Sequence, residues 1–247
     1  MPIHTNLKSA SAAASLVFYE RFRGFYSKTT NEKNSTAKAN TNFSSRSMRM
    51  AKQACIAMSH VSKLEISKEM IKRLSVAFEQ WFTNEQVQHN EPFNYMNTVC
   101  GFRFNSETCL NQKFETNFEI EWKSTNHINL KIPALTPRMD IIAPARTLSV
   151  CLNIISACIS INPARSSQFL KSFSFVQKEN PAIQLVIPYT KDITPAKEIE
   201  IAVALQPGCA TLLIASLEYI IMQKGKLANV TDAKWLPVDI LSAVYKK

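Results

Sequence analysis

Apolar residues recur at helical spacing from Ser35 to a break near Leu64 to Ser67. At about 100° per residue, one broad arc collects most of the apolar side chains. This arc holds Phe43, Met48, Met50, Ala51, Ala54, Cys55, Ala57, Met58 and Val61. Basic side chains fall on the remaining arc, and Ser35 is a suitable N-cap. The pattern therefore predicts an amphipathic helix that begins at Ser35 and breaks near residues 64–67.

A second amphipathic pattern follows that break and runs to Thr83. Its apolar face consists of Ile66, Met70, Ile71, Leu74, Ala77, Phe78, Trp81 and Phe82. The opposite face consists of Lys68, Lys72, Ser75, Glu79 and Gln80. Two neighbouring faces that both seek a core predict a helical hairpin over residues 35–83. The polar residues around Pro92 then predict a linker over residues 84–97.

From residue 98 onward the apolar period changes from helical spacing to two. Phe118, Ile120 and Trp122 alternate with charged residues, which predicts a strand with one wet face and a buried Trp122. Further strands are predicted over residues 99–104, 128–132, 148–161, 172–177, 183–187, 198–205, 211–222 and 238–244. Strands at this spacing without helices between them predict an antiparallel β-sandwich, Ig-like or similar, over residues 98–247. The predicted fold class is α+β.

Residues 1–34 form a basic arm that also carries aromatic side chains. Five aromatic residues lie between Leu16 and Lys28, with Gly24 at the natural turn, and this predicts a β-hairpin. An isolated hairpin is marginally stable in water, so its aromatic side chains need a cover from this chain or another one. The residues expected to carry self-association are Val17, Phe18, Tyr19, Phe22, Phe25 and Tyr26.

The net charge of +10 is concentrated in the N-terminal quarter of the chain. Residues 1–64 contain ten Lys and Arg against two Glu, which leaves +8 for this part. Such an asymmetry favours an anionic partner, such as nucleic acid or an acidic protein surface, although a solvated helix face explains the same pattern. The candidate contacts are Arg21, Arg23, Lys28, Lys38, Arg46, Arg49 and Lys52.

The sequence offers little catalytic chemistry. The four glycines build no phosphate-binding loop, and there is neither a Gly-x-Ser-x-Gly elbow nor a His-Glu-x-x-His motif. The four histidines are scattered, and the six cysteines form no Cys-x-x-Cys pair, so we expect buried, reduced thiols. We therefore expect no enzyme activity, no cofactor and no metal. No apolar run reaches membrane-spanning length and no signal peptide is evident, which predicts a protein of the cytoplasm or of an assembled particle.

Several short motifs resemble a family of uncharacterised proteins encoded by Bacteroidota. The resemblance rests on Leu16-Val17-Phe18-Tyr19 with Arg23-Gly24, Ile132-Pro133-Ala134-Leu135, Leu205-Gln206-Pro207, Leu217-Glu218-Tyr219 and Ile240-Leu241-Ser242-Ala243-Val244. In that family the first motif opens the hairpin and the others belong to the closing strands of a β domain. The resemblance implies the same organisation and a bacterial source, and it implies no activity.

Two functions from different classes fit these features. The first is a non-enzymatic structural or assembly protein that self-associates through its arm and hairpin, as a subunit of a particle, tube or filament, phage-like assemblies included. The alternative is a nucleic-acid-binding protein that uses residues 1–64 for phosphate contacts and base stacking. An adhesin or carbohydrate-binding sandwich would need export, and the absent signal argues against it. Binding to nucleic acid should weaken steeply with salt, whereas burial of aromatic side chains should not.

Overall fold

The computed structural model describes residues 35–84, 94–123, 126–161, 182–203 and 205–246, and in the two long helices it describes side chains from Ser44 to Thr83. The predicted hairpin over residues 16–28 and the predicted strand over residues 172–177 lie outside these ranges. The chain divides into two units, residues 1–40 and 41–247, and the packing described below belongs to the second unit.

Both predicted helices are confirmed. Helix α2 spans Ser35–Met58 and helix α3 spans Lys68–Asn84. The described apolar arcs are the packed faces, since Met50, Ala54 and Phe78 are fully buried. Ser67 caps α3, because its Oγ accepts the Met70 N–H at 3.0 Å. One polar assignment is wrong: Ser75 is buried, and its hydroxyl donates to the backbone carbonyl of Lys72, which removes the need for water.

The larger of the two sheets is antiparallel and contains six strands in the order β1-β9-β7-β4-β5, with β8 added beside β7. Its strands are β1 Asn94–Tyr95, β4 Thr147–Ser160, β5 Ile183–Pro188, β7 Cys209–Gln223, β8 Lys226–Asn229 and β9 Val238–Lys246. β4 and β7 form the centre, and they pair along almost their whole length, to the Ser160–Cys209 pair at one end. These long apolar strands match the sequence prediction closely.

A smaller antiparallel sheet has the order β2-β3-β6. Its strands are β2 Glu119–Lys123, β3 His127–Ile132 and β6 Lys197–Ala202. Three short helical turns complete the described elements: α4 Leu110–Lys113, α5 Pro137–Asp140 and the 3₁₀ turn η2 Ala233–Trp235.

The two sheets share one hydrophobic core. Ile128 and Leu130 of β3 belong to the same buried cluster as Leu152 of β4 and Leu217 of β7. Trp122 is 7% exposed, and its indole Nε1–H donates to the Ser242 hydroxyl of β9 at 2.8 Å. Its predicted burial is confirmed, as is a mixed α and β architecture with antiparallel sheets.

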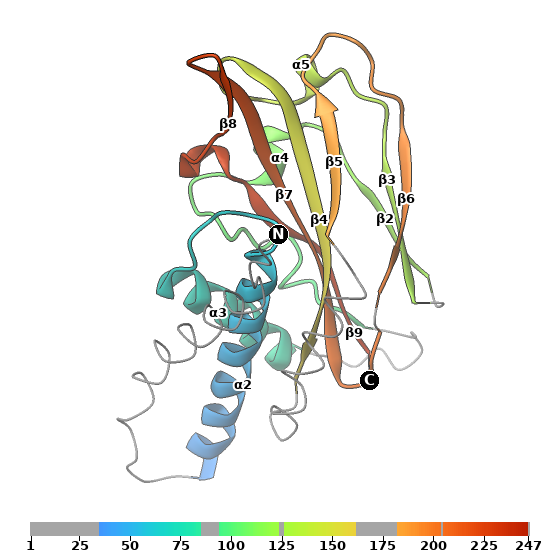
Figure 1. Cartoon of the computed structure of the whole chain (residues 1–247). Helices are drawn as coiled ribbons and strands as arrows, with labels where there is room; N and C mark the ends of the chain where they lie inside the picture. The colour runs from blue at the N-terminus through green and yellow to red at the C-terminus, as the bar shows by residue number, and fades with distance from the viewer. Residues whose placement is uncertain (1–34, 85–93, 124–125, 162–181, 204, 247) are drawn as a thin grey trace, which may run out of the picture. The chain divides into compact units, whose positions relative to one another are not determined.

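Helix α3 and the part of α2 that belongs to the second unit lie against the face of the larger sheet that is turned away from the smaller sheet (Figure 1). The Val61 carbonyl, just after α2, accepts hydrogen bonds from the Ser216 hydroxyl of β7 and from Asn153 Nδ2 of β4. Farther along, the Trp81 ring meets Tyr245 of β9 edge-on, with ring centroids 5.3 Å apart. Side chains alternate between the faces of a strand, so β4 and β7 pack against the smaller sheet on one side and against helices on the other.

The predicted strand over residues 99–104 is wrong. A turn that ends at Gly101 replaces its first half, and residues 101–104 meet β9 through the isolated bridge of Arg103 to Asp239 and through three backbone hydrogen bonds with Val238 and Ile240. Gly101 has a φ of +75°, which breaks the extended path. Val99 and Phe104 are nevertheless both buried, so the apolar pattern reflects a packed turn followed by a short irregular pairing with β9.

Two short strands were not predicted. β1 lies within the segment that the sequence suggests as a linker, and β8 follows β7 through Lys224 and Gly225. Both turn residues have positive φ, 50° and 75°, which matches the tight turn that joins antiparallel strands. The sequence signal for this hairpin was the single Gly225.

Candidate interaction site

Few of the residues predicted to bind partners lie in the described part of the chain. All candidate self-association residues, between Val17 and Tyr26, lie outside it, as do three candidate anion contacts, Arg21, Arg23 and Lys28. Lys38 belongs to α2, but its side chain is outside the described set. Arg46, Arg49 and Lys52 follow one another along the described part of α2, where Arg49 is exposed and the other two are half-buried. Their contact with an anion stays a prediction.

Asp239 is the buried carboxyl group of the described region. Its Oδ2 accepts the Leu110 N–H at 2.7 Å, and its Oδ1 has no hydrogen-bond partner among the described residues. Burial raises the pKa of Asp239 to about 6, against the opposing effects of the Leu110 N–H and the Arg103 guanidinium. The group links α4 to β9, and we assign it a structural role with a proton that titrates near neutral pH.

All six cysteines are unpaired, as predicted. Cys158 and Cys209 lie two positions apart in the register of β4 and β7, since Cys158 faces Thr211 and Ser160 faces Cys209. Their side chains hydrogen-bond to each other, which raises the pKa of Cys158 and lowers that of Cys209. Both thiols are almost fully buried, so the pair does not form an accessible nucleophile.

The described residues also contain no grouped metal ligands. Within these ranges, no three His, Cys, Asp or Glu side chains lie close enough together to hold a metal ion. No described helix has the length and apolar character that crossing a membrane requires.

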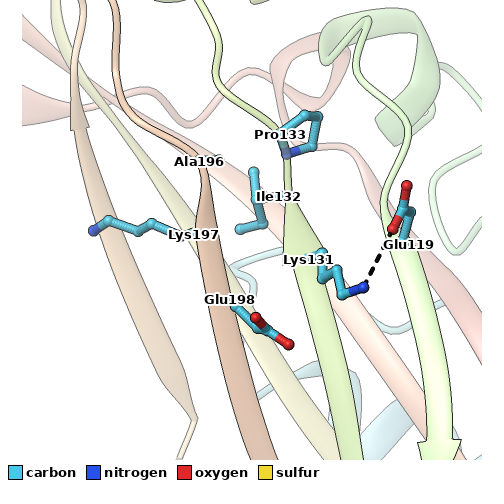
Figure 2. A pocket seen from close by; sticks show the side chains of 7 residues that line it. All are labelled: Glu119, Lys131, Ile132, Pro133, Ala196, Lys197 and Glu198. Carbon is cyan, nitrogen blue, oxygen red and sulfur yellow. Dashed lines mark ion pairs between the residues drawn. The ribbon is translucent and has the colours of Figure 1, made fainter.

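An open pocket lies on the smaller sheet and on the residues just beyond its strands (Figure 2). It is lined by Glu119, Lys131, Ile132, Pro133, Ala196, Lys197 and Glu198. Lys131 Nζ lies 3.8 Å from Glu119 Oε2, and both side chains are largely exposed. In Figure 2 Lys197 extends away from this pair.

The edge strand β5 differs from the other sheet edges. Its sequence from Ile183 to Pro188 contains no charged residue, and no described residue pairs with its outer side. Val186 is 56% exposed, and Ile183 and Leu185 are only half-buried although they pack against the core. Backbone groups along an open edge can pair with another strand, so β5 offers a binding surface made of main chain and apolar side chains.

The remaining edges are short or charged. β2 exposes Glu119, Glu121 and Lys123, and β6 exposes Lys197, Glu198 and Glu200. At the other end of the larger sheet, β1 has two residues. β8 has four and begins with Lys226. Charges and short length are two common ways in which proteins discourage strand addition, and β5 uses neither.

An exposed apolar surface lies beside β5. Leu148, at a bulge in β4, is 44% exposed, and Pro188 at the end of β5 is also exposed. Farther across the same end of the sheet, Met222 of β7 pairs with Leu227 of β8, and Leu227 is 68% exposed. The helical part therefore leaves apolar side chains open at this end of the sheet.

No protein-family model matches the chain, and no curated protein or solved structure matches it significantly. The resemblance to the Bacteroidota family therefore stays a prediction.

Sequence reasoning placed β5 among the sandwich strands but did not identify it as an edge. The run Ile183-Gln184-Leu185-Val186-Ile187 has the apolar composition of an interior strand. The available signal was the contrast with the charged runs of β2 and β6, and it becomes informative only when the strand order is known.

Proposed function

We propose that this chain is a non-enzymatic structural protein that self-associates through residues 1–34, as the subunit of a particle, tube or filament. In this proposal the sandwich, Ig-like or similar, is the building block and the two helices brace it. The protein works in the cytoplasm or in the assembled particle. The observation that carries the proposal is the uncharged edge of β5, because natural proteins seldom leave an apolar edge uncovered.

The aromatic residues between Leu16 and Lys28 supply the driving force. Complete burial of a large apolar side chain is worth about 1.5–3 kcal/mol, and this segment contains five aromatic side chains. The sum is comparable with the roughly 4–15 kcal/mol that association costs in translational and rotational freedom. A segment that gains this much from a cover is suited to hold two copies together.

Light scattering of the full-length protein over a range of concentrations tests the proposal. We expect the mass to rise with concentration and to change little between about 0.1 and 0.5 M salt, since aromatic burial is not screened. The double substitution Phe22→Asp with Phe25→Asp should abolish assembly, because a carboxylate buried without a partner is costly. Phe22→Leu with Phe25→Leu is the matched control and should retain most of it. A full-length protein that stays monomeric at every concentration would refute the proposal.

Nucleic-acid binding is the second candidate, and it is favoured by the basic residues Arg46, Arg49 and Lys52 on consecutive turns of α2. Fluorescence anisotropy with a labelled single-stranded oligonucleotide tests it. Contacts to several phosphates would give an affinity that falls steeply as salt is added. Arg49→Gln should then weaken binding and reduce the salt dependence. Affinity that is absent at low salt would eliminate this alternative.

A further inference from the structure

The open edge of β5 has the composition and length of an acceptor for one extended segment. We propose that residues 16–22 of a second copy add to β5 as a further strand of the larger sheet. This inference rests on the proposed function, and it assigns the surface that receives the N-terminal arm.

Main-chain pairing explains why β5 is the acceptor. Among the described residues the larger sheet ends at β5, whose partner on the inner side is β4 over the pairs from Ser149–Pro188 to Ile154–Ile183. Added strands gain affinity from backbone hydrogen bonds and specificity from alternate side chains. β5 offers both an unpaired edge in the described part of the chain and an exposed Val186.

The side chains on the two faces of β5 match an uncharged apolar segment. Ile183, Leu185 and Ile187 point toward the shared core, so the alternate positions Gln184 and Val186 point to the opposite face. An added strand would therefore meet the partly open core on one side and Val186 on the other. The incoming segment should therefore be apolar where it lies beside Leu185 on one face and Val186 on the other.

Residues 16–19 meet that requirement. Their sequence, Leu16-Val17-Phe18-Tyr19, is apolar or aromatic at every position, and Glu20 and Arg21 follow as the first charges. The stretch from Leu16 to Phe22 has seven residues, one more than β5. Covering its three aromatic side chains, Phe18, Tyr19 and Phe22, would bury about 450–750 Å² on the arm alone. A standard interface buries roughly 800 Å² per partner.

The arm is long enough to reach another molecule. α2 begins at Ser35, so twelve residues separate Phe22 from the helix. An extended chain spans about 3.3–3.6 Å per residue, which gives a reach of roughly 40 Å. An arm that binds an edge on a neighbour forms a heterologous contact, and contacts of this kind build rings or open filaments.

A complementation experiment tests the inference with full-length proteins. Val186→Lys places a charge on the acceptor edge, and Phe18→Asp disables the arm, while Val186→Thr is an uncharged β-branched control for the edge. Each of the first two variants alone should lose assembly, with an association constant at least about tenfold weaker. Mixed in equal amounts they should form a complex with the mass of two chains, because one variant retains the arm and the other retains the edge. Val186→Thr should assemble like the parent protein.

The outcomes separate the inference from the proposed function. Unchanged assembly of Val186→Lys would overturn the acceptor assignment and leave self-association intact. Loss of assembly in both variants without rescue on mixing would also overturn it, because the intact arm of one variant should bind the intact edge of the other. Loss of assembly in Val186→Lys but not in Phe18→Asp would overturn it as well, since a symmetric contact between two β5 edges behaves in this way. A parent protein that never assembles would remove the proposed function itself.

Cover from within the same chain gives a different result. In that case Val186→Lys would lower the melting temperature at every protein concentration, which would overturn the inference. If Val186→Lys proves poorly folded, the pair Phe18→Cys and Val186→Cys in one chain provides a second measurement. Mild oxidation should link these cysteines between copies, and each single variant should remain unlinked. Absence of such cross-links in an assembled sample would overturn the inference as well.

Discussion

The larger sheet buries its central strands β4 and β7 on both faces, whereas the smaller sheet buries one face and exposes the other. Inward-facing positions of β2 and β3 such as Trp122 and Leu130 join the core, and their neighbours Glu121 and Lys131 face water. The alternation that solvates the smaller sheet also places charges along its edges. The larger sheet lacks that alternation, because helices cover the face that would otherwise carry the charges. The edge strand β5 does alternate in burial, but its exposed positions carry no charge and include Val186, which is 56% exposed. An uncharged apolar strand at a sheet edge can pair with another strand.

The largest expected effect on the free energy of unfolding comes from a cavity in the core of the larger sheet. Leu152→Ala removes a fully buried side chain of β4 and should lower the free energy of unfolding by about 2–5 kcal/mol. Ile120→Ala in β2 removes a half-buried side chain and should cost less than half as much. Urea unfolding of both variants measures the difference. Equal losses would show that the smaller sheet contributes as much to the core as the larger one.

The larger sheet also differs in holding a buried carboxyl group, that of Asp239 in β9. The folded protein keeps a proton on Asp239 up to about pH 6, whereas an ordinary Asp loses it near 3.8. The folded state therefore binds more protons between these values, and stability should fall as pH rises from about 4 to 6, by at most about 3 kcal/mol.

Asp239→Asn should remove this pH dependence and stabilise the protein at pH 7.5. The amide oxygen can still accept the Leu110 N–H, and no charge remains to be buried. Denaturant unfolding at pH 4.5 and 7.5 measures the effect, with the exposed Asp192→Asn as the matched control. An unchanged pH dependence in Asp239→Asn would contradict the assignment.

One arginine of α3 binds that helix to the segment that runs beside β9. Arg73 donates through its two terminal nitrogens to the carbonyls of Arg103 and Phe104, at 3.1 and 3.0 Å, and its guanidinium lies over the Phe102 ring. Arg73→Ala should cost about 2 kcal/mol, since hydrogen bonds to a charged donor are worth about 1.5–3 kcal/mol each and these are partly exposed. Arg73→Lys should recover only part of the loss, because Lys lacks the planar fork. Equal stability of Lys and Ala variants in thermal unfolding would argue against this pair of bonds.

The smallest change in the free energy of unfolding is expected on the solvent-exposed face of the smaller sheet. Glu119→Gln breaks the exposed ion pair with Lys131 and should change the free energy of unfolding by less than about 1 kcal/mol. A larger loss of unfolding free energy, measured by the same denaturant titration, would mean that this ion pair contributes to the stability of the sheet.

The two helices, the long strands β4 and β7 and the burial of Trp122 could be predicted from sequence, because each rests on a periodic pattern many residues long. Short elements could not. β1 and β8 contain two and four residues, and both are fixed by pairing with strands that lie elsewhere in the sequence. The burial of Asp239 has the same origin, because the group that it binds, the N–H of Leu110, is more than a hundred residues away.

The candidate site could be predicted in part. The aromatic run of the N-terminal arm can be recognised in the sequence, but the strand proposed to accept it cannot. Ile183-Gln184-Leu185-Val186-Ile187 reads alike at the centre and at the edge of a sheet, and only the order of strands tells the two positions apart.

Late pairing of β9 has a consequence for how this protein folds. Asn105, Leu110 and Trp122 bond to residues 236–242 across separations of 120–131 residues. β9 also lies between β1 and β7, so the sheet has a gap until this last strand inserts. Contacts so distant along the chain slow folding, to the millisecond-to-second range typical of sandwich folds. Until β9 is synthesised and inserts, β1 and β7 would each keep an edge that β9 covers in the folded protein, and exposed strand edges of this kind favour aggregation.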